Sequence, residues 1–129
     1  MKALLIACFL CFSWILLNGF SSESDLSKLM RLMTSDAKKL REKVQQGDKI
    51  PMFYKKYKRI YTAKASADGK KGSEFDGLAA AFLLNCERLQ NADNASRKGA
   101  YNAMVTACIR CHEKYCPGPI NMLKKLQLP

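Results

Sequence analysis

Apolar residues recur at alternating spacings of three and four along four stretches of the chain, with charged residues between them. This is the period of an α-helix with one apolar face, so each stretch predicts an amphipathic helix. The expected helices begin and end as follows: Ser24 or Asp25 to Gly47, Pro51 to about Lys64, Glu74 to about Asn91, and Asn94 or Ser96 to Pro117. No stretch of comparable length alternates with the period of a β-strand.

The connections between these stretches are short, and the longest polar break of the mature chain, Ser66–Ser73, has the composition of a loop. A chain of 129 residues fits one domain, and it contains no internal repeat. Four helices with one apolar stripe each predict an all-α fold, an antiparallel up-down-up-down four-helix bundle. Cofactors in such bundles sit between facing helices.

Residues 1–21 have the layout of a signal peptide, with a basic Lys2, an apolar run from Ala3 to Leu17 and small residues around Gly19. The apolar run is too short to favour a permanent membrane span. We therefore expect cleavage after Ser21, a single mature domain of residues 22–129, and a location in the bacterial periplasm without a stable membrane span.

The chain is basic, with 22 Lys and Arg residues against 11 Asp and Glu residues. An exported chain whose lysines are scattered, without a recognition motif, is a poor candidate for binding nucleic acid. A positive surface of this kind favours encounter with an acidic partner protein.

The segment Cys108-Ile109-Arg110-Cys111-His112 holds two cysteines and the only histidine of the chain. On a helix, these three side chains share one face. The spacing is the attachment signature of c-type haem. In that chemistry the thiolates of Cys108 and Cys111 add to the two haem vinyl groups, and a ring nitrogen of His112 bonds the iron. The sequence therefore predicts one covalently bound haem c.

Two other interpretations of this segment are weaker. A structural zinc site needs four ligands, and the chain has no second histidine to help supply them. A thioredoxin-like pair of cysteines belongs at the start of a helix that follows a strand, and no such strand is expected here.

Cleavage of the signal peptide removes Cys8 and Cys11, and haem attachment uses two more cysteines, which leaves Cys86 and Cys116. Because exported proteins meet an oxidising environment, we predict a disulfide between Cys86 and Cys116. The alternative is that Cys86 is a small apolar residue buried in the core.

The single histidine also limits the other axial position of the iron, because a bis-histidine haem is excluded. The sixth ligand must be a methionine, a weaker donor such as lysine, or nothing. The mature chain has five methionines: Met30, Met33, Met52, Met104 and Met122. Met104 lies two turns before His112 on the same predicted helix, so it would approach the iron from the wrong direction. Met122 follows Pro117-Gly118-Pro119 in a short predicted tail, and Met52 lies at the edge of the second predicted helix.

The segment Tyr101–His112, at the end of the last of four predicted helices in an exported chain, resembles the cytochrome c-prime family. In that family the haem lies inside the bundle, and a residue of the first helix faces the iron from the distal side. That residue is Leu or Phe in five-coordinate members and Met in low-spin members. The resemblance implies that Met30 is the distal ligand, with Met33 as the second choice.

Two features depart from the family pattern. Leu26 stands where family members often carry an arginine that meets the haem propionates. The segment Cys116-Pro117-Gly118-Pro119 is not general to the family.

An iron bound by both His112 and Met30 has no open position, which favours electron transfer over substrate chemistry. The sequence therefore predicts a one-electron carrier without catalytic residues, and not an enzyme. If Met30 does not bind the iron, the alternative is a five-coordinate haem protein that binds nitric oxide or carbon monoxide. A structural or assembly role is a third option. Bundles of this kind can form homodimers, and the sequence leaves a homodimer open.

Overall fold

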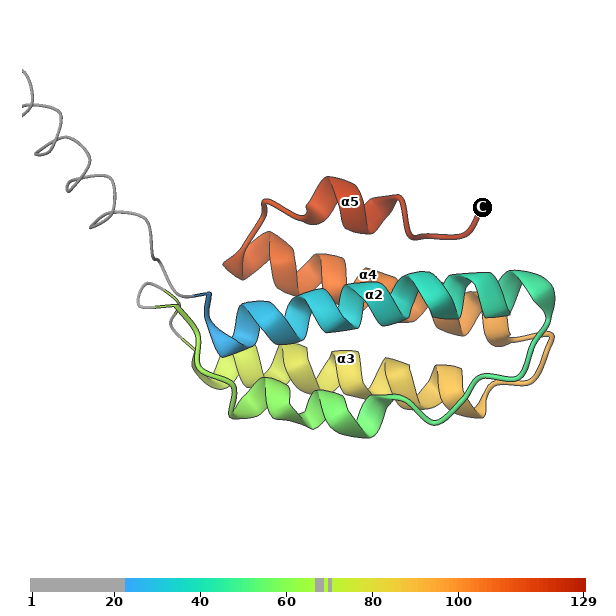
Figure 1. Ribbon diagram of the computed structural model, residues 1–129, viewed down its shortest axis with the longest axis horizontal. Helices are drawn as coiled ribbons and strands as arrows, with labels where there is room; N and C mark the ends of the chain where they lie inside the picture. The colour runs from blue at the N-terminus through green and yellow to red at the C-terminus, as the bar shows by residue number, and fades with distance from the viewer. Residues whose placement is uncertain (1–22, 67–68, 70) are drawn as a thin grey trace, which may run out of the picture.

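The computed structural model describes residues 23–66, 69 and 71–129, so the predicted signal peptide lies outside the described residues. The described residues form helices and no β-strand, which confirms the all-α prediction. In chain order the elements are α2 (Asp25–Gln46), the 3-10 helix η1 (Tyr54–Tyr61), α3 (Ser73–Asn91), α4 (Arg97–Tyr115) and α5 (Ile120–Lys124) (Figure 1).

Helix α2 begins and ends at the predicted residues. The Ser24 side chain accepts a hydrogen bond from the backbone N–H of Ser27 at 3.1 Å, which caps the first turn. Gly47 ends the helix with a φ of 75°, in the left-handed region where glycine avoids steric strain. The buried face of α2 carries residues at helical spacing: Leu29, Met33, Ala37 and Leu40.

The second predicted helix, residues 51–64, is shorter than expected. The structure has an eight-residue 3-10 helix instead, η1, which an extended segment precedes. Its buried residues Tyr57 and Ile60 are three positions apart, and a 3-10 helix has three residues per turn. Lys58 and Arg59, which lie between them, are exposed, so they add no packing that would favour a longer helix.

Contacts with α3 hold the start of η1 in place. The Tyr54 hydroxyl donates a hydrogen bond to Glu87 Oε1 at 3.0 Å. The backbone N–H of Phe53 donates to Gln90 Oε1 at 3.2 Å. These two bonds come from outside η1, so tertiary contacts decide where this segment begins.

Helices α3 and α4 form the most extensive helix pair of the fold. The rings of Phe75 and Tyr115 pack edge to face with centroids 5.4 Å apart, and Lys114 Nζ lies 3.0 Å from Glu74 Oε1. These contacts join the start of α3 to the end of α4. Figure 1 shows the two helices side by side with α2 across them.

The C-terminal segment is part of the core, although the sequence predicted only a tail after Pro117-Gly118-Pro119. The chain turns there and runs back along α4 as α5 (Figure 1). The Asn102 side chain fixes its end, donating to the Leu128 carbonyl at 2.9 Å and accepting from the Leu128 N–H at 2.8 Å. Three leucines of this segment are buried: Leu123, Leu126 and Leu128. Within the described part of the chain, no helix is long and apolar enough to cross a membrane.

Arg97 joins the start of α4 to the turn that follows α2. It is only 9% exposed, and its guanidinium donates to the carbonyls of Gly47 at 3.2 Å and Asp48 at 2.8 Å.

Replacing Arg97 with methionine tests this role. Arg97→Met keeps an apolar side chain but leaves both carbonyls without this donor, so we expect the free energy of unfolding in urea to fall by about 1–3 kcal/mol. The exposed neighbour gives the control, since Lys98→Met should change stability by about 0.5 kcal/mol at most. Equal stability of the two variants would contradict this role.

Candidate functional site

An apolar hollow lies inside the fold, with walls from α2, η1, α3, α4 and the C-terminal segment. Among the described residues, its lining contains no carboxylate, lysine or arginine, and His112 is its only imidazole. Such a lining suits an apolar organic group with one specific polar contact.

Helix α4 places two of the three residues of the Cys-Ile-Arg-Cys-His segment at this hollow, since Cys108 and His112 line it. Cys111 is buried and lines a second hollow at the end of the bundle. His112 and Met30 line both hollows, so the two spaces meet at these side chains.

The orientation of His112 is set by the turn that ends α4. Its Nδ1 lies 2.9 Å from the carbonyl oxygen of Cys116. Because a carbonyl can only accept, this contact requires the proton on Nδ1. The other ring nitrogen, Nε2, then carries the lone pair with which a neutral imidazole binds a metal. A backbone carbonyl in this role is the usual way in which proteins orient a histidine ligand.

The two motif thiols lie in a nonpolar environment. Burial, together with the neighbouring Cys111 thiol, raises the pKa of Cys108 to about 12. Burial likewise raises the pKa of Cys111. Both groups are therefore neutral thiols near pH 7 in this structure. Among the described residues, no three His, Cys, Asp or Glu side chains are grouped so that they could hold a metal ion.

The two methionines predicted as distal ligands both line the apolar hollow from α2. Met30 is partly buried, whereas Met33 is buried with 8% of its surface exposed. Met30 alone of the two also lines the second hollow with His112. The structure therefore brings Met30 and His112 to the same space from two different helices.

Cations border the second hollow, which the sequence did not predict. Arg31 and Lys71 both line it, together with His112. Lys71 donates to the carbonyl of Ile60 at 2.9 Å and also to that of Ala63, at the end of η1. Leu26 lines the same hollow, and Arg31 beside it pairs with Glu23.

The residues present fit a haem in their chemistry. Two thiols and a metal-binding imidazole nitrogen come from one helix, a thioether faces them from another, and the walls are apolar. The free volume of the apolar hollow is only ≈ 40 Å³. Side chains along the hollow must therefore repack to admit a porphyrin.

Tyr57 and Asp36 form a polar contact in the wall that sequence reasoning missed. The Tyr57 hydroxyl donates to Asp36 Oδ2 at 2.7 Å, and Lys56 Nζ lies 2.6 Å from the same oxygen. Partial burial alone would raise the pKa of Asp36, but hydrogen bonds from Lys56 and Tyr57 and the nearby lysine charges lower it. Burial, then the bond to Asp36, raises the pKa of Tyr57, so its hydroxyl stays a neutral donor. No sequence signal links residues 21 positions apart.

The predicted disulfide between Cys86 and Cys116 is not formed, and all four described cysteines are free thiols. Cys116 follows Tyr115, whose ring packs on Phe75 at the start of α3. Cys86 lies eleven residues further along α3, which is roughly 16 Å at the rise of an α-helix. A disulfide needs Cα atoms about 4.4–6.8 Å apart. The alternative interpretation holds instead, because Cys86 is fully buried in the core.

A thiol titration checks this correction. The unfolded and unreduced chain of residues 22–129 is expected to show four free thiols, or two where Cys108 and Cys111 carry haem. In the native protein the exposed Cys116 should react quickly, whereas burial raises the pKa of Cys86 and shields it until unfolding. Cys116→Ser, the matched variant, should remove the fast reaction alone. A count of zero free thiols in the haem-loaded chain would show that Cys86 and Cys116 form the predicted disulfide.

Comparison with known proteins gives no match, since no family model, no curated protein and no solved structure is significantly similar to this chain. The motif and the geometry around it are therefore the basis for a functional proposal.

Proposed function

We propose that this protein is an exported monohaem c-type cytochrome of the cytochrome c-prime type, a one-electron carrier and not an enzyme. Cys108 and Cys111 hold the haem covalently, and His112 and Met30 are the axial ligands of the iron. The observation that carries this proposal is that His112, with its Nε2 left free, and Met30 line the same apolar hollow from different helices.

Each residue has a distinct part in this proposal. The Cys116 carbonyl holds the His112 ring in the tautomer that can bind iron. The apolar walls exclude water, and Arg31 and Lys71 lie where the negative propionates would need cations. The bound haem supplies the one-electron couple, whose potential a methionine ligand raises.

The frame of the proposed site is an up-down-up-down bundle in which η1 stands for the second helix. Contacts at both ends of η1 support this arrangement. Tyr54 at its start bonds Glu87 near the end of α3, while the carbonyl of Lys64, just beyond its end, accepts from the N–H of Leu26 at the start of α2 at 2.9 Å. The proposed location is the periplasm, after cleavage of residues 1–21.

Covalent haem attachment tests the proposal. The full chain, expressed in a bacterial host that carries a haem-attachment system, should give one haem per protein by pyridine haemochrome assay and by mass after denaturation. Cys108→Ser/Cys111→Ser should abolish covalent haem, because the other pair of cysteines at this spacing, Cys8 and Cys11, is followed by Phe12 and not by a histidine. Cys86→Ser/Cys116→Ser is the matched control and should retain it. Absence of covalent haem from the wild-type protein would overturn the proposal.

One observation favours a second candidate, a five-coordinate haem protein that binds nitric oxide or carbon monoxide. The apolar hollow that Met30 lines with Cys108 has no charged side chain among its described lining residues, so an iron without a sixth protein ligand would face an apolar pocket suited to a small neutral gas. The two candidates share the attachment site and differ only in what Met30 does.

A further inference from the structure

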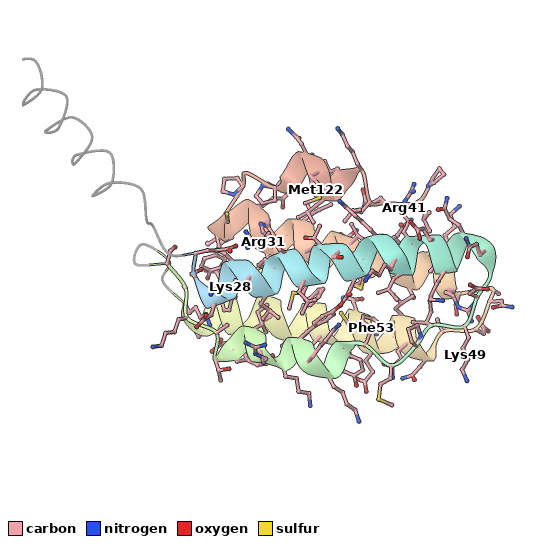
Figure 2. All side chains as sticks on the ribbon, in the orientation of Figure 1. Lys28, Arg31, Arg41, Lys49, Phe53 and Met122 are labelled. Atoms are coloured by element: carbon pink, nitrogen blue, oxygen red, sulfur yellow. The ribbon has the colours of Figure 1, made fainter. Side chains whose placement is uncertain are left out.

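A groove lies on the outside of the bundle, between α2 and the residues that lead into η1. Lys39 and Lys43 line it from α2, and Lys55 and Lys56 line it from the start of η1. Met52, on the rim, is 68% exposed, the highest exposure of any large apolar side chain in the described residues. In Figure 2, Phe53 lies on the inner side of this segment, while nitrogen-tipped side chains project outward from η1.

The charge of this groove is positive. Its only lining carboxylate is Asp36, which is already bound by Lys56 and Tyr57. Within the described residues, Lys39 and Lys55 make no ion pair. The other two lysines of the groove are paired within the chain, Lys43 with Asp48 at 3.8 Å and Lys56 with Asp36 at 2.6 Å. The second hollow near His112 likewise has acids beside its cations, since Arg31 pairs with Glu23 and Lys114 with Glu74. Lys39 and Lys55 are thus the uncompensated charges of the outer groove.

The floor of the groove adjoins the proposed haem site. Leu40, only 4% exposed, lines both this outer groove and the apolar hollow that contains Cys108 and His112. Leu40 is therefore part of the wall between the groove and the hollow. A molecule bound in the groove would contact the side chain that also lines the hollow.

We propose that this groove, formed by residues 36–43 and 51–56, docks an acidic redox protein. The assignment rests on the proposed electron-carrier function. Lys39 and Lys55 pair with carboxylates around the rim of the partner, and exposed Met52 contacts its apolar centre, an arrangement of apolar core and charged rim that speeds short-lived encounters. Electrons then pass by way of the shared Leu40 wall.

The test is a titration of isotope-labelled mature holoprotein with a short poly-glutamate peptide, followed by NMR. Chemical-shift changes are expected at residues 36–43 and 51–56. Lys39→Glu/Lys55→Glu should weaken peptide binding about tenfold at low salt, because it reverses the two unpaired charges of the groove. Lys124→Glu/Lys125→Glu makes the same charge change on α5 and should weaken it about twofold at most.

Three results would overturn the docking surface: shift changes centred elsewhere, equal weakening by the α5 control, or tighter binding to phosphatidylglycerol vesicles that Lys39→Glu/Lys55→Glu abolishes. The last would assign the groove to a membrane surface. A chain that lacks covalent haem but binds the peptide in this groove would contradict the proposed function and leave the surface in place. An active electron carrier that binds the peptide elsewhere would refute the surface alone.

Discussion

Replacing Met30 with leucine is expected to convert the oxidised holoprotein from low-spin to high-spin iron and to abolish its methionine charge-transfer band. Leucine keeps the apolar volume of the wall but has no atom that can bind a metal. A methionine ligand raises the reduction potential of a c-type haem, so the potential should also fall. Axial ligands span a range of roughly 0.8 V, and we expect a fall on the order of a tenth of it. Absorption spectra and a redox titration measure both effects.

Met33→Leu is the matched control, because Met33 lines the same hollow from the same helix. It should leave spin state and potential close to those of the wild-type protein. A wild-type protein that is already high-spin and binds carbon monoxide readily would contradict ligation by Met30 and favour the gas-binding candidate. A change of spin state in Met33→Leu but not in Met30→Leu would identify Met33 as the distal ligand.

The parts of the site that lie on one helix could be predicted from the sequence. The spacing of Cys108, Cys111 and His112 fixes their common direction once α4 forms, because helix geometry alone relates them. The limits of α2 were equally local, since Ser24 and Gly47 cap it by short-range contacts. The carbonyl of Cys116 that orients His112 is also only four residues away.

The features that the sequence missed depend on contacts between distant segments. The start of η1 depends on bonds to Glu87 and Gln90 on α3, which no local pattern encodes. The disulfide prediction rested on the number of cysteines and not on their positions along the bundle axis. Cys86 and Cys116 lie at different positions along this axis. The groove at Lys39 and Lys55 likewise joins two segments.

The C-terminal segment shows the same limit, and it leads to the largest stability effect that we expect. A Pro-Gly-Pro break favours the end of a helix, so residues beyond it were expected to form a tail. The structure instead buries Leu123 and Leu126 against the hollow, where both side chains form part of its lining. These leucines close the apolar site from outside α4, so the segment supports both the core and the proposed haem pocket.

Leu123→Ala/Leu126→Ala is therefore expected to destabilise the protein by about 4 kcal/mol or more, since each buried leucine costs roughly 2–5 kcal/mol when truncated to alanine. That is a large part of the stability of about 5–15 kcal/mol that a domain of this kind has. Urea unfolding of the holoprotein measures the loss. The thioethers should keep the haem attached, so the same samples can report water entry through a changed haem spectrum.

Met122→Ala/Lys125→Ala separates the loss of buried packing from any disturbance of α5 itself. Both residues belong to the same segment but are exposed, Met122 with 36% of its surface. Since surface substitutions usually change stability by about 0.5 kcal/mol at most, this control should unfold almost as the wild-type protein does. If the leucine variant unfolded at the same urea concentration as this control, the C-terminal segment would only rest on the surface. The walls of the hollow would then have to come from the four longer elements alone.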